Sequence, residues 1–446
     1  MTIPRIGILS RCAAVLLLSG CESGPSDPTP CRSVPLGNFA ACLPPEEFPH
    51  VEAPGEVARS TTPRDPERVA TALEFQEVAS GNTQLAFALY QRSISGTENL
   101  FFSPYSVSSA FSMLYAGARG QTEAQMAQAL NFTLPQERHH LAMRELADFV
   151  ITDASAPTSG SGTAPAFHSM NSAWAQQGTP LHPAFLDTLA HDYDSGVHLM
   201  DFQGQTSRAR EEINQWIETR TGGRIQNLLN EGTVTNATRL MLVNVLFFHG
   251  SWSTPFLANG TQDQPFTALD GTSHSVPTMR GGKGQYLRGD GFEAVTLGYR
   301  HDEYRMLIVV PEQGRFAEVE ARLSPGFLTQ LRAGLESRHL DIRLPRFKID
   351  STPDLVPVLK SLGMTDAFTS NADFSGLSSE RLLLSSVSHR AYVSVNERGT
   401  EASAATAVGT APASDPETVH VNRPFIFTIE HVPTRQLLFL GRYVKP

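Results

Sequence analysis

The segment from Thr400 to Val408 limits what this chain can fold into more than any other, because it is built almost entirely from alanine, serine and threonine. Apart from Glu401 its side chains are small, so it cannot hold itself in a hydrophobic core, which favours an exposed loop. Its order is nevertheless that of a strand, in which one face would carry Thr400, Ala402, Ala404, Thr406 and Val408. Such a face could enter a sheet without a steric or desolvation penalty. We therefore predict a loop that can become a strand.

The flanking sequence distinguishes this interpretation from an ordinary alanine- and threonine-rich surface linker, which the segment alone allows equally well. Val395–Val408 resembles the hinge of the reactive-centre loop in serpins, the serine protease inhibitor family. Asn422–Phe427 and Leu438–Pro446 resemble the C-terminal strands of that family. The three motifs occur in the family's order. The resemblance places the reactive-centre loop at about 397–421.

Residues 1–21 are expected to form an export signal. Arg5 and Arg11 are followed by the short apolar run Ala13–Leu18, which is too short to span a bilayer. The run ends in Leu-Ser-Gly-Cys, which resembles a bacterial lipobox, so we expect Cys21 to be lipidated. The alternative is an ordinary cleaved signal with a coincidental cysteine. The expected location is therefore outside the cytoplasm, at the cell envelope or in the extracellular space.

Residues 22–68 are expected to be a tether, because Pro, Ser, Gly and acidic residues dominate without helical or strand periodicity. Cys31 and Cys42 lie in this segment and form a possible disulfide in an exported protein. The remaining 69–446 contains no cysteine, so thiol catalysis and cysteine-based metal sites are excluded there. We expect this part to be one domain.

Hydrophobic periodicity within 69–446 predicts alternating helices and strands. Helices are expected around Leu85–Leu89, Pro104–Tyr115, Thr122–Phe132, Arg208–Arg220 and Leu355–Leu362. Strands are expected at Leu100–Phe102, Asn171–Trp174, Leu240–Trp252, Tyr304–Pro311, Leu340–Pro345 and Phe347–Asp350. Several of these segments also resemble serpin segments. The resemblance implies a mixed α/β serpin fold with a large, mainly antiparallel central sheet, two smaller sheets and about eight or nine helices.

No motif for an enzyme is found. The chain has no G-x-S-x-G, H-E-x-x-H or P-loop motif, and its 14 histidines are scattered. We therefore expect no catalytic residue, no metal site and no cofactor. The formal net charge of −10 argues against a nucleic-acid partner. The small basic cluster formed by Arg138, His139, His140 and Arg144 is expected to be a solvated helix face.

The resemblance also implies a cluster of polar residues beneath the point where the main sheet opens. Serpins place two serines, an asparagine and a histidine there, and the matching positions are Ser103, Ser106, Asn244 and His389. The imidazole of His389 could bond Asn244 across two strands, so that a buried polar cluster is satisfied. The alternative is four unrelated residues, each satisfied locally.

By resemblance, the protein inhibits serine endopeptidases as a suicide substrate. The protease would attack the loop, form a covalent acyl complex and be carried along as the cleaved loop inserts into the main sheet. The family pattern places the reactive bond at Ala413–Ser414, and the hinge comprises Gly399, Thr400, Glu401, Ala402, Ser403, Ala404, Ala405 and Thr406. The small Ala413 predicts elastase- or subtilisin-like targets.

We expect a monomer that contacts membranes only through the lipid at Cys21. The open alternatives are a non-inhibitory serpin that acts as a binding module and an exported hydrolase with an unrecognised site.

Overall fold

A computed structural model describes residues 51–150, 166–400 and 416–446 of the chain. Its helices are α1 (Ala72–Ser93), α2 (Pro104–Tyr115), α3 (Gly120–Leu130), α4 (Gln136–Val150), α5 (Pro183–Tyr193), α6 (Thr206–Arg220), α7 (Phe316–Ala321), α8 (Pro325–Gly334) and α9 (Leu355–Ser361). One 3-10 turn follows at Asp366–Phe368. The helices predicted from hydrophobic periodicity are present; α1 is much longer than the predicted Leu85–Leu89, and the ends of the others agree within about two residues. Cys21, Cys31 and Cys42 lie outside the described residues.

The main sheet has seven strands in the order β1-β4-β3-β5-β15-β14-β13. These are β1 (Glu56–Ala58), β4 (Val197–Met200), β3 (Ala166–Gln176), β5 (Leu240–Ser251), β15 (Gly399–Thr400), β14 (Ser386–Asn396) and β13 (Phe347–Ser351). Most neighbours are antiparallel, but β3 with β4 and β5 with β14 are parallel. The prediction of a mixed α/β fold with a large central sheet is confirmed.

A second sheet has the order β11-β8-β9-β10-β17-β18-β2, and a third has β16-β12-β7-β6. The second comprises β11 (Glu336–Ser337), β8 (Gln285–Gly289), β9 (Phe292–Gly298), β10 (Tyr304–Pro311), β17 (Phe425–His431), β18 (Gln436–Tyr443) and β2 (Leu100–Phe102). The third comprises β16 (Glu417–His420), β12 (Leu340–Pro345), β7 (Ser273–Gly281) and β6 (Gln262–Thr267). The second sheet has as many strands as the main one and is smaller only in strand length, since β10 and β18 have 8 residues and β5 has 12.

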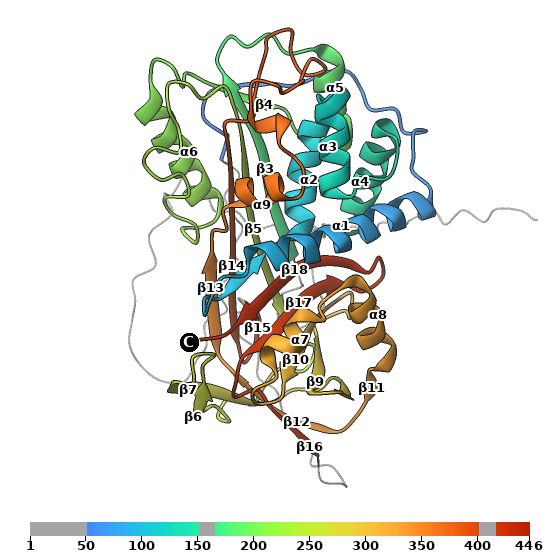
Figure 1. Cartoon of the computed structure of the whole chain (residues 1–446), viewed down its shortest axis with the longest axis vertical. Coiled ribbons are helices and arrows are strands. Elements are labelled where there is room, and N and C mark those ends of the chain that lie inside the picture. The colour runs from blue at the N-terminus through green and yellow to red at the C-terminus, as the bar shows by residue number, and fades with distance from the viewer. Residues whose placement is uncertain (1–50, 151–165, 401–415) are drawn as a thin grey trace, which may run out of the picture. The chain divides into compact units, whose positions relative to one another are not determined.

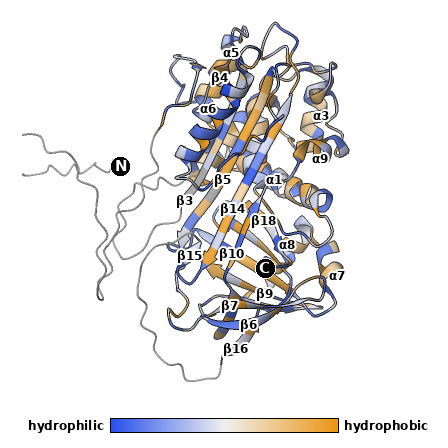
Figure 2. Ribbon diagram, turned by 90° about the vertical axis from the view of Figure 1, so that its left-hand side faces the viewer, coloured by the Kyte–Doolittle hydropathy of each residue, from blue (hydrophilic) through white to orange (hydrophobic). Residues whose placement is uncertain are grey.

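The apolar run of β5 is explained by burial on both faces. Met241, Val243 and Val245 pack with the inner face of α6, where Ile213 and Ile217 are fully buried. The alternating side chains of β5 belong to the two clusters on the other side of the sheet. In Figure 1, α6 lies on one side of the main sheet and α2 to α4 lie on the other. Figure 2 shows apolar stretches along β5 and β10.

Residues 51–68, which the sequence placed in the tether, lie against the body; we call them the N-terminal strap. Within it β1 pairs antiparallel with β4 and so extends the main sheet by one edge strand. The carbonyl of Val51 accepts a bond of 3.1 Å from Trp216 Nε1, and Arg59 forms an ion pair with Asp194. The sequence offers no signal for this because β1 has three residues and Val57 is half exposed. The folded part therefore begins before Val69.

In the part of the chain that the structure describes, no helix is both long enough and apolar enough to cross a membrane.

The expectation of a solvated basic face on α4 is wrong for three of its four residues; only Arg138, whose side chain is 36% exposed, reaches solvent. His139, His140 and Arg144 are 1%, 4% and 4% exposed. His139 Nε2 lies 2.7 Å from Ser112 Oγ, and Arg144 Nη1 donates to Asp192 Oδ1 at 3.2 Å. These partners come from α2 and α5, between which the basic side of α4 packs. The partners are distant in sequence, so the local charge pattern could not reveal them.

Burial of these histidines predicts acid sensitivity. Burial lowers the pKa of His140 to about 3 and also lowers that of His139, whereas both would titrate near 6.5 in the unfolded chain. Between these values only the unfolded state takes up protons, so each histidine should reduce the free energy of unfolding by about 1.4 kcal/mol per pH unit as pH falls below about 6.5. Urea unfolding from pH 8 to pH 4 measures this slope.

In the His140→Gln variant, the free energy of unfolding should fall less steeply below pH 6.5. Between pH 7 and pH 8 it should stay nearly constant. Replacing the exposed His301 by Gln serves as the control, since it should leave the slope unchanged. If His140→Gln has the same slope as the parent protein, His140 does not contribute to the acid sensitivity.

Candidate functional site

The main sheet contains one parallel contact at its centre, between β5 and β14. Seven residue pairs join them, from Ser386 opposite Met241 to Tyr392 opposite Phe247. Beyond these pairs the two strands diverge, and β15 lies between their C-terminal ends. Thr400 stands opposite Val395 on one side and Gly250 on the other, antiparallel to both strands. Figure 2 shows β15 at the lower ends of β5 and β14. β15 thus has the position and the direction of the first residues of a new central strand.

Gly399 is required where the chain turns into this gap. A Cβ atom at this position would lie 2.0 Å from the carbonyl oxygen of Gly250 and 2.8 Å from the Cα of Ser251. Contacts this short do not occur, so no other residue could bring the backbone so close to β5. The hinge therefore begins with a glycine for a steric reason.

Thr400 is the first side chain inside the sheet, and it is fully buried. Its hydroxyl lies 2.7 Å from the hydroxyl of Tyr299, which is also fully buried. Because side chains alternate along a strand, this contact also defines which face of the following residues would point into the core. Tyr299 was not predicted as a site residue, and nothing in its local sequence indicates the role.

The turn before the hinge is held by contacts from three separate segments. Trp252 Nε1 donates to the carbonyl of Asn396 at 3.0 Å, and the backbone N–H of Trp252 donates to the carbonyl of Arg398 at 2.8 Å. Arg346 Nε donates to Glu397 Oε1 at 2.8 Å. Burial raises the pKa of the Glu397 carboxyl, but its hydrogen bonds to Arg346 and Thr261 outweigh burial and leave the pKa below its usual value. The sequence did not identify these anchors because each joins positions far apart in the chain.

The four polar residues predicted beneath the opening lie in one hydrogen-bonded cluster. Asn244 and His389 are 1% and 2% exposed and stand opposite each other on β5 and β14. His389 Nδ1 contacts Asn244 Oδ1, and Asn244 Nδ2 donates to the carbonyl of Ser106 at 2.9 Å. The backbone N–H of Ser103 donates to His389 Nε2 at 3.4 Å, and Ser103 Oγ accepts from the N–H of Ser106 at 3.1 Å.

The direction of these bonds fixes the tautomer of His389. A backbone N–H can only donate, so Nε2 of His389 is the acceptor and Nδ1 carries the proton. Burial lowers the pKa of His389 to about 3, which keeps the ring neutral at physiological pH. Asn171 on β3 is a further member that the sequence did not reveal, and its Oδ1 accepts from Ser106 Oγ at 3.1 Å.

The remaining hinge residues, Glu401 to Thr406, and the predicted reactive bond Ala413–Ser414 lie outside the described residues. Among the described residues, no group of three or more His, Cys, Asp or Glu side chains could hold a metal ion.

Comparisons with known proteins agree with this geometry. A family model described as Serpin (serine protease inhibitor) matches residues 80–446. A serpin-like protein of Thermococcus kodakarensis is 32% identical over 394 residues, which cover 87% of this chain and 90% of that protein. The leukocyte elastase inhibitor of Sus scrofa is 33% identical over 386 residues, which cover 83% of this chain and 100% of the inhibitor.

Solved structures show the same fold. Uncleaved ovalbumin superposes with a TM-score of 0.74 at 26% identity and covers 83% of this chain and 100% of its own. The thermophilic serpin tengpin in its native state gives 0.75 at 25% identity, covering 88% and 100%. Human thyroxine-binding globulin complexed with its ligand gives 0.74 at 28% identity, covering 84% and 99%. Serpins are protease inhibitors or binding proteins and not enzymes. The leukocyte elastase inhibitor and thyroxine-binding globulin are examples of the two roles. With the family model covering most of its length, this chain belongs to the serpin family.

Proposed function

We propose that this serpin inhibits serine endopeptidases by inserting its cleaved reactive-centre loop between β5 and β14. The observation that carries the proposal is β15, which already occupies the end of that gap as an antiparallel strand. Extending β15 would replace one parallel contact by two antiparallel ones, and antiparallel pairing is the more stable per residue. The sheet therefore gains ladder hydrogen bonds when the loop enters it.

The register of β15, continued along its two neighbours, gives the expected position of each residue of the inserted strand. Every step forward from Thr400 moves one position back along both neighbours. Six steps bring Thr406 opposite His389 on β14 and Asn244 on β5, the pair that now bond each other. Nine steps bring Gly409 opposite Ser386 and Met241, where the present contact between β5 and β14 begins. Insertion would thus separate the whole parallel contact and the central bond of the polar cluster.

Because Thr400 is buried, it indicates which residues of the inserted strand would face the core. These are the residues at even positions. Ala402 would stand opposite Val393 and Phe248, and Ala404 opposite Ala391 and Leu246. Small side chains at these positions fit against the larger neighbours without a new cavity or clash. This explains why the hinge contains almost only small side chains.

The target class follows from the residue before the reactive bond. Ala413 is small, and no Lys, Arg, Phe, Tyr or Trp lies between Gly399 and Asn422. This composition suits elastase- or subtilisin-like proteases, and similarity to the leukocyte elastase inhibitor supports the same class. The protein would act as a monomer, held outside the cytoplasm by lipid on Cys21.

The mechanism is tested by Thr406→Arg. The inserted arginine would be buried beside His389 and Asn244 without a partner, and burying an unpaired charge costs several kcal/mol. The protease should still cleave the loop at its normal rate, because the residues around Ala413 are untouched. Insertion would slow relative to deacylation, so the number of inhibitor molecules consumed per inhibited protease should rise by at least tenfold.

Ala405→Arg is the matched control, because residue 405 would lie on the opposite face of the strand, beside the partly exposed Arg390, and it should change the stoichiometry far less. Equal and unchanged stoichiometry in both variants would contradict strand insertion. A binding-only serpin would yield no denaturation-resistant complex with any protease, and an unrecognised hydrolase would turn over a substrate.

Ala413→Arg tests the position of the reactive bond. Trypsin-like proteases read a long cation before the bond that they cleave. We expect the parent protein not to inhibit trypsin, whereas the variant should acquire trypsin inhibition and lose inhibition of elastase-like proteases. Mass spectrometry of the released C-terminal peptide should find Ser414 at its start. A start more than two residues away would refute the assignment.

Cys21→Ser tests the anchor. A diacylated or triacylated N-terminus binds membranes stably, whereas the unmodified chain does not. The parent protein should partition with the membrane fraction and the variant should become soluble. The same distribution for both proteins would leave an ordinary secreted serpin.

A further inference from the structure

The outer face of the third sheet carries a row of basic side chains. Arg343 on β12 stands directly opposite Arg280 on β7 and opposite His420 on β16. Its neighbours in β12, Ile342 and Leu344, are fully buried, so the row lies on the face that points away from the core. The arginine side chains are partly exposed to solvent. In Figure 1 the three strands lie at the lower end of the molecule.

The basic row is unfavourable by itself. Neighbouring strands are about 4.8 Å apart, and like charges directly opposite each other destabilise a sheet. One carboxylate, that of Asp341, serves both arginines, because it accepts from Arg280 Nε at 2.9 Å and from Arg343 Nη2 at 3.5 Å. The shorter contact belongs to Arg280, so Arg343 keeps much of its positive charge uncompensated.

Arg423, which follows β16, adds a third guanidinium group beside the row. Its Nε donates to the carbonyl of Pro311 at 2.6 Å. Its Nη1 donates to the carbonyl of His420 at 3.3 Å and to Asn422 Oδ1 at 3.0 Å. All three acceptors are uncharged, so they hold the side chain in place without neutralising it.

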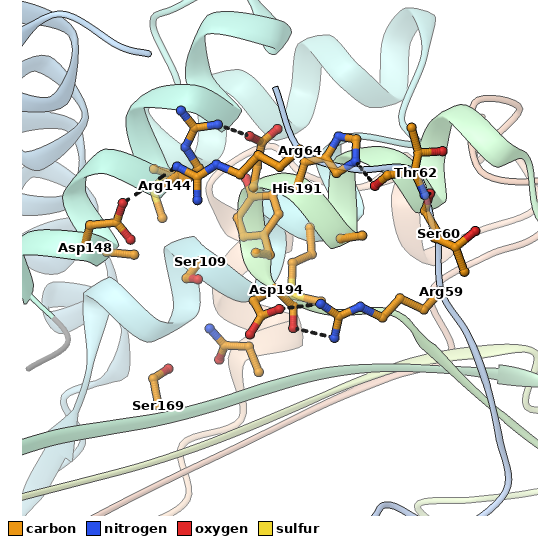
Figure 3. A pocket seen from close by; sticks show the side chains of 18 of the residues that line it. Arg59, Ser60, Thr62, Arg64, Ser109, Arg144, Asp148, Ser169, His191 and Asp194 are labelled. Carbon is orange, nitrogen blue, oxygen red and sulfur yellow. Dashed lines mark hydrogen bonds and ion pairs between the residues drawn. The ribbon is translucent and has the colours of Figure 1, made fainter. Parts of the chain in front are cut away.

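The arginines of the N-terminal strap show the more usual arrangement, in which each faces its own carboxylate. Arg59 pairs with Asp194, and Arg64 lies 4.0 Å from Asp148 (Figure 3). On the third sheet, by contrast, one carboxylate serves two arginines and the third arginine bonds neutral oxygens. This face therefore has an excess of positive charge, although the whole chain has a formal net charge of −10.

Two buried nitrogen atoms in the row also lack an acceptor. Among the described residues, neither Arg343 Nε nor His420 Nε2 has a hydrogen-bond partner. Buried polar groups are nearly always satisfied, and an unsatisfied one points to a water molecule or an ion at the site. Arg343 Nε can only donate, so its missing partner is an acceptor. Because the two residues stand opposite each other, one acceptor group can serve both when His420 carries a proton on Nε2.

We propose that Arg343 and His420 bind a tetrahedral oxyanion, a phosphate or sulfate group, with Arg280 and Arg423 on either side of it. The oxygens of such a group accept from guanidinium groups in pairs, and its charge offsets the repulsion along the row. The row spans three strands, about 10 Å, which suits one such group. A long polyanion would be repelled by the negative charge of the rest of the chain. The site shares no residue with the hinge or the polar cluster and does not rest on the proposed function.

Binding is tested by calorimetric titration with inorganic sulfate at constant ionic strength. Arg343→Met and His420→Leu should each weaken sulfate binding about fivefold or more, because each removes one of the two donors and its charge. Arg338→Met is the matched control, since Arg338 pairs with Glu336 outside the row, and it should bind sulfate as the parent does.

Thermal unfolding identifies any variant that has not folded, and the other variant then decides. Equal sulfate affinity in the parent and in both folded variants would overturn the site. No detectable binding of sulfate to the parent would overturn it as well.

The imidazole of His420 gives an independent readout. Burial lowers its pKa, and the positive charges of Arg343 and Arg423 lower it further. The charged groups around the ring and the neighbouring guanidinium groups are Arg280, Arg343, Arg423, Asp341, Glu293 and Glu312. An oxyanion at Nε2 favours the protonated ring, so sulfate should raise the pKa of His420 by about half a pH unit or more in an NMR titration. The signal of the exposed His274 on β7 should not respond to sulfate. An identical titration of His420 with and without sulfate would overturn the contact.

The source of the group is distinguished with lipid vesicles, because a free ion and an anionic head group present the same oxygens. Cys21→Ser serves as the background, since it removes any lipid anchor. If the ligand is a head group, this protein should sediment with phosphatidylglycerol vesicles and not with phosphatidylcholine vesicles, and Arg343→Met should abolish the sedimentation. If it binds sulfate but neither kind of vesicle, the ligand is a free ion. Either result supports the oxyanion site, which the sulfate titration decides.

Discussion

The parallel contact between β5 and β14 is the constraint on which the rest of this structure depends. β5 and β14 are antiparallel to their other neighbours, β3 and β13, but parallel to each other, and they diverge only at the end where Thr400 enters. A strand added between them would pair antiparallel on both sides, so the described state leaves stabilising hydrogen bonds unmade. In the proposed mechanism, the helices, the second sheet and the anchors of the hinge hold the sheet closed until the loop is cut.

The buried polar cluster lies at the contact between β5 and β14, which must separate if a strand is inserted. His389 and Asn244 face each other across the parallel contact, and backbone groups of α2 complete their hydrogen bonds. A satisfied buried cluster specifies one arrangement, because a partly satisfied one is costly. Insertion would place Thr406, a small residue with a hydroxyl, between the two side chains. The same residues could then bond the new strand, so the cluster suits both the closed and the open sheet.

The N-terminal strap adds a contact on the outer edge of the same sheet. Through β1 it lengthens the sheet beyond β4, and through Arg59, Arg64 and Arg68 it reaches acidic residues of α4 and of the turn after α5. β4 in turn pairs with β3, and Asn171 on β3 belongs to the polar cluster. The strap and the polar cluster are therefore connected through neighbouring strands of one sheet.

The sequence by itself determined the elements whose signal is local. Three signals each follow from a few neighbouring residues: the unbroken apolar run of β5, the Ser103–Pro104 start of α2 and the alternation of small residues from Thr400 onward. The motifs indicated the family and the four polar positions.

Only the tertiary structure decided which distant residues meet. It buried His139, His140 and Arg144 against partners on α2 and α5, drew residues 51–68 onto the body, and added Tyr299, Asn171 and the Glu397–Arg346 pair to the site. A local pattern reports the periodicity and volume of side chains, whereas the partner of a buried polar group is set by the packing of segments far apart in the chain.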